Sequence, residues 1–128
     1  MDKAALTDFS VHFLDCWTSQ DVGSVLSCYT DDLVYLDPNT RGEIRGGDAF
    51  GRYLAKLFSA WRMEWKFRDA HPHLNGDDFT LLWRGSFMKP GGGITVEADG
   101  MDLVQVKDGL ITRNEVYFDR SALAELMK

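Results

Sequence analysis

The spacing of apolar residues changes once along this chain, near residue 62. Before that point apolar side chains recur at the helical period of 3.6 residues, and after it they alternate with the two-residue period of strands. Three glycine-containing turn sequences divide the second half, namely Asn75-Gly76-Asp77, Pro90-Gly91-Gly92-Gly93 and Asp108-Gly109. The pattern predicts four consecutive strands, at about residues 63–74, 78–89, 94–107 and 110–119.

The first half of the chain predicts three helices and one short strand. Apolar residues at helical spacing indicate a first helix over about residues 3–19, and Asp21 is expected to be the N-cap of a short second helix. A strand then ends at Asp37, and Gly46-Gly47-Asp48 opens a third helix. The predicted order is ααβαββββ, followed by a short C-terminal helix that starts near Ser121.

This order predicts the α+β fold class. A long, twisted antiparallel sheet cannot leave an apolar concave face in water, so the three helices of the N-terminal half must cover it. The expected shape is a cone with an interior lined by both layers. No repeat, linker or low-complexity tract interrupts the 128 residues, so we expect one domain over residues 1–128.

Composition excludes several classes of partner. The net charge of -6 argues against binding to nucleic acid or to an anionic membrane surface. The N-terminal residues lack the apolar run of a signal peptide, and no later segment is long and apolar enough for a membrane span. Cys16 and Cys28 lack CxxC spacing, which favours free thiols over a disulfide. We therefore expect a cytoplasmic protein.

Asp37 is the clearest candidate for chemistry. It stands where a short strand enters the helix-covered apolar space, and Pro38 ends that strand. An apolar environment can shift the pKa of a carboxyl group, and such a group is a candidate for general acid–base catalysis. An aspartate before a proline is also ordinary turn chemistry, so a capping role for Asp37 stays open.

The element order and several local motifs resemble the cystatin-like α+β group, which holds nuclear transport factor 2, SnoaL-type polyketide cyclases and ketosteroid isomerases. The matching motifs are the Asp-Asp-x-x-x-x-Asp-Pro run at 31–38, Ile-Arg-Gly at 44–46, Asp108-Gly109-Leu110-Ile111 and Val116-Tyr117-Phe118-Asp119-Arg120. The resemblance covers nearly the whole chain and implies the cone fold. It does not identify a reaction, because the group includes both enzymes and non-enzymes.

The resemblance to ketosteroid isomerases assigns roles to two carboxyl groups. Asp37 matches the general base, and Asp102 falls where that family keeps a protonated acid in its oxyanion hole. Strand parity places Asp102 on the face of Val104, which supports an inward side chain. A pair with Arg84 or Arg113 across the sheet, or an exposed position beyond a bulge, stays open for Asp102. The family's phenolic donor falls on Phe13, which cannot donate a hydrogen bond. Steroid isomerisation is therefore disfavoured, and Tyr35 or Tyr53 is a candidate replacement donor.

Two further side chains are candidates for the pocket. In a second relative, limonene epoxide hydrolase, an arginine would fall on Arg84, but this chain lacks that enzyme's catalytic aspartates. His71 is a candidate proton shuttle. The pair His71 and His73 lacks a third metal ligand of convincing spacing, so we predict no metal site and no organic cofactor.

The aromatic residues suit a pocket for a flat, hydrophobic molecule, and they also suit a plain core. The residues expected to contact a substrate are Phe13, Trp17, Tyr35, Tyr53, Phe58, Trp61, His71 and Arg84.

Two hypotheses for the function follow. The first is a cofactor-independent isomerase or cyclase in which Asp37 takes a proton beside the carbonyl of a small hydrophobic substrate and Asp102 or a tyrosine steadies the enolate. The alternative is a non-catalytic ligand-binding or dimerisation module. The resemblance also implies a homodimer formed through the outer face of the sheet.

Overall fold

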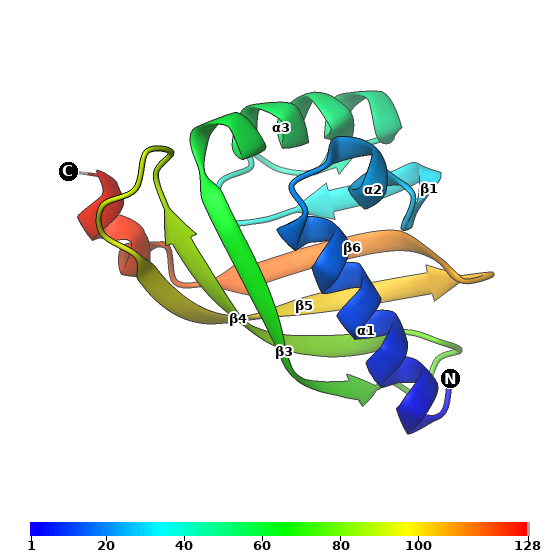
Figure 1. The fold of residues 1–128 in the computed structure, drawn as a ribbon. Coiled ribbons are helices and arrows are strands. Elements are labelled where there is room, and N and C mark those ends of the chain that lie inside the picture. The colour runs from blue at the N-terminus through cyan, green and yellow to red at the C-terminus, as the bar shows by residue number, and fades with distance from the viewer. Residues whose placement is uncertain (128) are drawn as a thin grey trace.

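The computed structural model describes residues 1–127 and contains a six-stranded sheet with helices on one side (Figure 1). The elements are α1 (Lys3–Thr18), α2 (Val22–Leu26), β1 (Tyr29–Leu36), β2 (Ile44–Arg45), α3 (Gly47–Ala60), β3 (Arg62–Pro72), β4 (Phe79–Met88), β5 (Val96–Lys107), β6 (Leu110–Phe118) and the 3-10 helix η1 (Arg120–Met127). The α+β class, the three helices and the four long strands are as predicted. No helix in residues 1–127 is long and apolar enough to cross a lipid bilayer.

The sheet has the strand order β2-β1-β6-β5-β4-β3 and is antiparallel at every pairing except one. β1 runs parallel to β6, with Tyr35 opposite Asn114. This parallel pair was not expected from the sequence. It arises because α3 carries the chain from β2 at one edge to β3 at the other, and the final strand fills the place beside β1.

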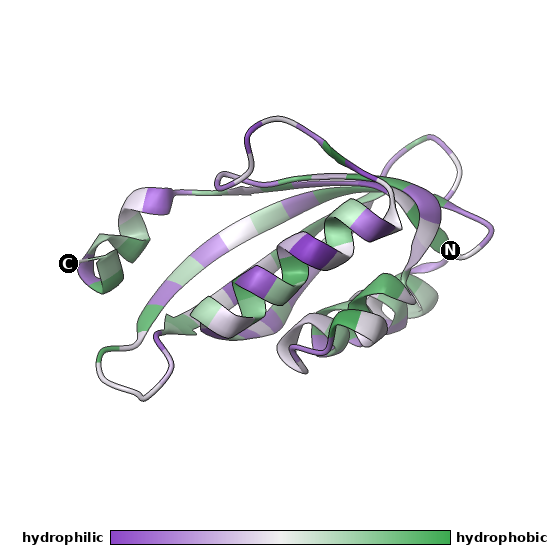
Figure 2. Ribbon diagram, turned by 90° about the horizontal axis from the view of Figure 1, so that it is seen from above, coloured by the Kyte–Doolittle hydropathy of each residue, from purple (hydrophilic) through white to green (hydrophobic). Residues whose placement is uncertain are grey.

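α1 and α3 lie on the same side of the sheet, which curves around them (Figure 2). Each of the first two helices begins at a capping aspartate. Asp2 accepts a hydrogen bond from the Ala5 amide at 2.8 Å, and Asp21 accepts one from the Ser24 amide at 2.8 Å, as predicted for Asp21. The buried face of α1 includes Phe13 and Trp17, so it supplies aromatic side chains to the interior.

β3 contains an irregularity that decides which of its residues face inward. Its register against β4 shifts between Phe67 and Asp69. A bulge adds one residue to a strand and so reverses the faces of the residues beyond it. Ala70 is consequently fully buried, and His71 is exposed, although simple alternation from Trp65 places His71 on the inward face.

The turn between β5 and β6 has the backbone geometry that its sequence predicts. Asp108 and Gly109 have φ values of 53° and 80°, both in the left-handed region required by a two-residue hairpin turn. The tight turn brings Asp102 on β5 opposite Val116 on β6.

A glycine in β5 makes room for the largest side chain of the inner sheet face. Trp83 on β4 pairs with Gly100 on β5, and both residues lie on the same face of the sheet. A Cβ atom at Gly100 would lie 2.4 Å from atoms of the Trp83 indole, so the ring occupies the space that a side chain would need. Trp83 is 2% exposed, which leaves the ring little room to move.

We predict that Gly100→Ala lowers the free energy of unfolding by about 1–3 kcal/mol, because the added methyl group overpacks the buried indole. Chemical denaturation measures the change. Gly47→Ala is the matched control, since a Cβ there meets no atom within 4 Å, and it should not destabilise the fold. Equal stability of Gly100→Ala and the parent would contradict the packing described above.

Candidate functional site

A cavity of about 170 Å³ is lined by residues of α1, the long strands and the C-terminal helix η1. Its wall is mainly aromatic, with Trp17 from α1, Trp61 after α3, and a set of residues from the long strands. The strand residues are Met63, Trp65, Trp83, Phe87, Val116 and Phe118. Asp37, Asn39 and Arg120 provide the polar and charged groups of the lining. The volume suits a molecule of roughly one ring, since an apolar cavity of about 150 Å³ holds benzene.

A second, smaller pocket of about 30 Å³ lies beside this cavity, toward the interior. The two spaces share five lining residues, namely Trp17, Tyr35, Trp65, Trp83 and Val116. Phe13, Leu14 and Asp102 line the inner pocket only. One carboxyl group therefore lies beside the outer cavity, on Asp37, and another lies beside the inner pocket, on Asp102.

Asp102 is 4% exposed and receives hydrogen bonds from both neighbouring strands. The Trp83 indole Nε1 donates to Oδ1 at 2.8 Å, and the Asn114 amide Nδ2 donates to Oδ2 at 3.1 Å. Each donor is a diagonal neighbour of Asp102 across a strand pair. The Trp83 bond depends on Gly100, because the indole reaches Asp102 across the glycine.

The hydrogen bonds continue from Asp102 to β1. The Tyr29 hydroxyl donates to Asn114 Oδ1 at 2.8 Å, and both residues are buried. Burial raises the pKa of the Tyr29 hydroxyl well above its ordinary value, so Tyr29 remains a donor. The chain of bonds has a fixed direction: Tyr29 donates to Asn114, and Asn114 donates to Asp102. Asp102 is its final acceptor.

Burial raises the pKa of Asp102 from 3.8 to about 6. The hydrogen bonds from Trp83 and Asn114 oppose this rise, and the charge of Asp37 adds to it. The folded protein therefore holds this proton more tightly than the unfolded chain does. The resulting contribution to stability is complete below the ordinary pKa and is lost as the pH rises through about 6.

Asp37 follows the last residue of β1, and its carboxylate accepts four hydrogen bonds in the described structure. The Tyr35 hydroxyl donates to Oδ2 at 2.7 Å, and the Tyr53 hydroxyl from α3 donates to the same oxygen. The Asn39 and Thr40 amides donate to Oδ1 at 2.7 and 3.1 Å. Asp37 thus caps the turn that follows it and also joins β1 to α3.

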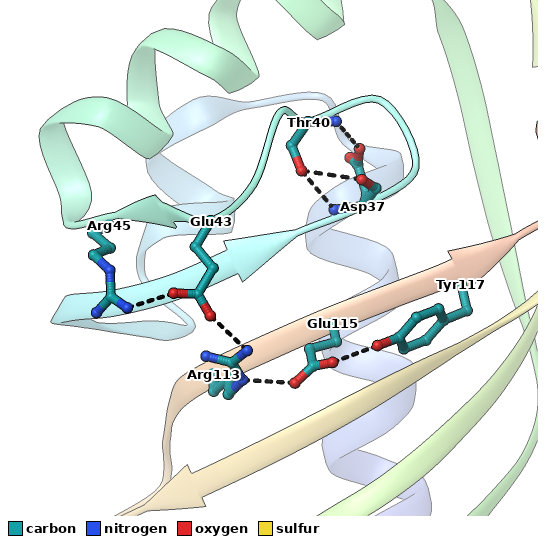
Figure 3. A network of polar contacts seen from close by, with 7 residues as sticks. All are labelled: Asp37, Thr40, Glu43, Arg45, Arg113, Glu115 and Tyr117. Atoms are coloured by element: carbon teal, nitrogen blue, oxygen red, sulfur yellow. Dashed lines mark hydrogen bonds and ion pairs between the residues drawn. The ribbon is translucent and has the colours of Figure 1, made fainter.

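Ion pairs hold the loop of residues 37–43, which connects β1 to β2, against the sheet (Figure 3). Glu43, at the far end of this loop, pairs with Arg113 on β6 at 2.7 Å and also with Arg45. Arg113 pairs in turn with Glu115 at 2.6 Å, and Glu115 accepts a hydrogen bond from Tyr117. The loop is therefore held at both ends, by the Asp37 turn and by the Glu43 pair.

The structure brings part of the predicted residue set together. Asp37, Trp17, Tyr35 and Trp61 line the outer cavity, and Phe13 and Asp102 line the inner pocket. Two further predicted residues line neither space, but each contacts a residue that does. Tyr53 donates its hydroxyl to Asp37, and Phe58 packs edge-on against Trp17 with ring centroids 6.0 Å apart.

Two predicted residues lie outside both spaces. His71 faces outward beyond the β3 bulge and pairs with Asp69 at 3.5 Å. Arg84 lies on the opposite face of β4 from Trp83, and it pairs with Asp99 at 2.8 Å. Both side chains are more than half exposed.

The sequence interpretation did not select several residues that the structure places at the site. Asn114 is the most important, because it connects Asp102 to Tyr29. Strand alternation was a usable signal, since a polar Asn114 shares the inward face of β6 with Val116 and Phe118. Arg120 and Leu123 reach the cavity from η1, and the sequence offered no signal for the docking of that helix.

Within residues 1–127, the side chains close enough to share a metal ion are His12, Cys16 and Cys28. None of the three lines the cavity or the inner pocket. The polar groups that line the two spaces are the carboxyl groups of Asp37 and Asp102, the guanidinium of Arg120, the amide of Asn39, the phenol of Tyr35 and the indoles of the tryptophans.

Comparison with solved structures shows the same fold in proteins of low sequence identity. A candidate polyketide cyclase from Xanthomonas campestris pv. campestris has 17% identity and a TM-score of 0.83, with all of both chains covered. A candidate isomerase from Bacillus subtilis has 13% identity and a TM-score of 0.85, with 99% of this chain and 96% of that chain covered. TerC, crystallised with polyporic acid, has 20% identity and a TM-score of 0.79, with 95% and 97% covered.

These identities establish a common fold and no more. A search of curated protein sequences finds no match. A family model gives the assignment: the model of the SnoaL-like domain matches residues 11–114, which include the second half of α1, the Asp37 turn, Asp102 and Asn114. The chain belongs to the SnoaL-like domain family.

Proposed function

We propose that this protein binds a small, flat carbonyl compound in the aromatic cavity and moves a proton on the carbon next to the carbonyl. Asp37 is the general base that takes this proton. Asp102, in its protonated form, donates a hydrogen bond to the oxygen of the resulting enolate. Return of the proton from Asp37 to a different carbon of the enolate completes an isomerisation. In a ring closure the enolate carbon instead attacks a second carbonyl group of the substrate, and the proton goes to the alkoxide oxygen that this attack forms.

The observation that carries this proposal is the presence of two carboxyl groups beside two adjacent spaces that share part of their walls. Asp37 lines the outer cavity, Asp102 lines the inner pocket, and five residues belong to both linings. The two groups are in different surroundings: Asp102 is buried, whereas Asp37 is half-buried and accepts bonds from two phenols. Carboxyl groups in contrasting environments are a recurrent basis for acid and base roles.

The hydrogen bonds of Asp102 favour the role of an acid. Both of its protein partners are donors, so a proton on Asp102 finds no acceptor in Trp83 or Asn114. A protonated Asp102 can therefore donate its hydrogen bond to a ligand atom in the inner pocket. The lining residue Phe13 lacks a hydroxyl, so Asp102 takes the place of a phenolic donor at this end.

The aromatic wall supports a flat substrate. Trp17 stacks on Tyr35 with ring centroids 5.8 Å apart, and Trp65 meets Trp83 edge-on at 6.4 Å. Solved structures of the same fold include a candidate polyketide cyclase and a protein bound to polyporic acid. We extend from them only the class of ligand, a planar molecule that carries oxygen atoms.

One observation favours a non-catalytic function as the second candidate. The four hydrogen bonds to Asp37 occupy about as many positions as a carboxylate offers. A carboxylate satisfied in this way is a good turn cap, and it has little free capacity to accept a proton from a substrate. In this alternative the cavity binds a ligand without converting it, and Asp37 only holds the loop.

We also propose, from the family resemblance, a cytoplasmic homodimer. Met101 and Tyr117 are cross-strand partners that are 41% and 50% exposed, and they provide an apolar area on β5 and β6 for such a contact.

We predict that Asp37→Asn slows the exchange of α-protons for deuterium in a flat, one-ring ketone such as acetophenone by about 10²–10⁴-fold, because an amide cannot accept the proton. Proton NMR in D₂O measures exchange above the uncatalysed rate. Asp31→Asn, which changes an exposed carboxylate on β1, is the matched control and should retain the parent rate. Binding of the ketone without enzyme-dependent exchange in the parent protein would favour the binding module.

We predict that a carboxyl-carbon NMR titration of Asp102 has a midpoint at about pH 6. Trp83→Phe should move this midpoint upward, because it removes an N–H donor that stabilises the ionised form. Since the proposed donor is protonated Asp102, the exchange rate should fall above the same midpoint and follow it in Trp83→Phe. A midpoint near the ordinary value of 3.8, or a rate profile that ignores it, would contradict the acid role.

A further inference from the structure

Three potential metal ligands from two parts of the chain meet beside α1. His12 and Cys16 belong to α1, and Cys28 lies between α2 and β1. Their ligand atoms all lie within 4.8 Å of one another, and Cys16 Sγ is 3.6 Å from His12 Nε2. Both cysteines are free thiols.

The local structure explains why these side chains converge. His12 and Cys16 are four residues apart, so they lie on one face of α1. The short α2 then reverses the chain, and hydrogen bonds fix the backbone of Cys28. Its amide donates to Val25 at 3.0 Å, and its carbonyl accepts from the Ile111 amide at 2.9 Å. Cys28 is therefore held by the sheet, whereas the other two ligands are held by the helix.

The spacing is close to that of a tetrahedral zinc site. Zinc binds thiolate at about 2.3 Å and imidazole at about 2.0–2.1 Å, which puts neighbouring ligand atoms about 3.5–3.8 Å apart. The 3.6 Å between His12 Nε2 and Cys16 Sγ lies in this range, and no other pair exceeds 4.8 Å. Small rotations of the side chains are sufficient to close the remaining distances.

We propose that His12, Cys16 and Cys28 form a binding site for Zn²⁺, with the fourth coordination position filled by water. Exposure decreases across the three ligands, from exposed His12 through half-buried Cys16 to buried Cys28. The ion reaches the site from the solvent side, and its water ligand lies beside His12. Two thiolates and one imidazole are a donor set that selects zinc over magnesium or calcium.

The site acts as a clip between α1 and the start of β1. Each cysteine precedes an aromatic residue of the interior: Trp17 lines the cavity, and Tyr29 donates to Asn114. Because the ion binds the folded arrangement and not the separated segments, it stabilises the fold. None of the three ligands takes part in the proposed proton transfer, so the zinc site and the proposed function can be tested independently of each other.

The test uses the full chain with both thiols kept reduced, and Co²⁺ as a spectroscopic probe for Zn²⁺. We expect one Co²⁺ per chain, with a thiolate-to-cobalt charge-transfer band that Zn²⁺ abolishes, and a higher melting temperature with Zn²⁺. His12→Ala should weaken Zn²⁺ binding by at least about tenfold. This variant keeps both thiols and alters only an exposed helical residue, so it should fold. Cys16→Ser should lower the charge-transfer intensity per bound Co²⁺ to about half, because only the Cys28 thiolate remains.

His71→Ala is the matched control, because it removes an exposed imidazole from β3 and should leave Zn²⁺ affinity unchanged. Three results would overturn the proposal: no charge-transfer band in the reduced protein, equal Zn²⁺ affinity of His12→Ala and the parent, or equal weakening by His71→Ala. A Cys16–Cys28 disulfide that forms in air without any band in the reduced protein would identify the pair as a redox pair instead.

Discussion

The hydrogen bonds that Asp102 receives from both neighbouring strands organise the interior of this protein. A carboxyl group at 4% exposure is costly to bury unless polar groups surround it. Trp83 and Asn114 meet this need as diagonal neighbours, and each requires a specific environment of its own. Trp83 requires the open space above Gly100, and Asn114 requires the Tyr29 hydroxyl as a donor to its carbonyl oxygen. One buried acid thus links four strands: β1, β4, β5 and β6.

The two carboxyl groups of the cavity are held by different means, and this difference is the basis for separate chemical roles. Asp102 is held by side chains of the sheet and is shielded from water, so its pKa rises. Asp37 is held by backbone amides of its own turn and by two phenols, one of which comes from α3. The position of Asp37 therefore depends on the packing of α3 against the sheet, whereas that of Asp102 depends on strand register.

Much of this arrangement could be predicted wherever alternation along a strand is regular. Parity alone placed Asp102 inward with Val104, and the capping rule identified Asp21. The same reasoning was wrong about the face of His71, because a bulge in β3 reverses alternation beyond Phe67 and the sequence carries no clear signal for it. The position of η1 at the cavity and the Glu43–Arg113 ion pair could not be predicted either, since both depend on contacts between distant segments.

The sequence by itself determined the α+β class, the order of the helices and long strands, the turns and the inward position of Asp102, because period, capping and turn chemistry are local properties. It did not reveal the two-residue strand β2, which exists only through its pairing with β1. The tertiary structure decided which strands are neighbours, which aromatic residues enclose the cavity, and that Tyr35 and Tyr53 share one oxygen of Asp37. It also decided that His12, Cys16 and Cys28 meet. Such meetings depend on how α1, α2 and β1 pack together, and packing between segments leaves no periodic trace in the sequence.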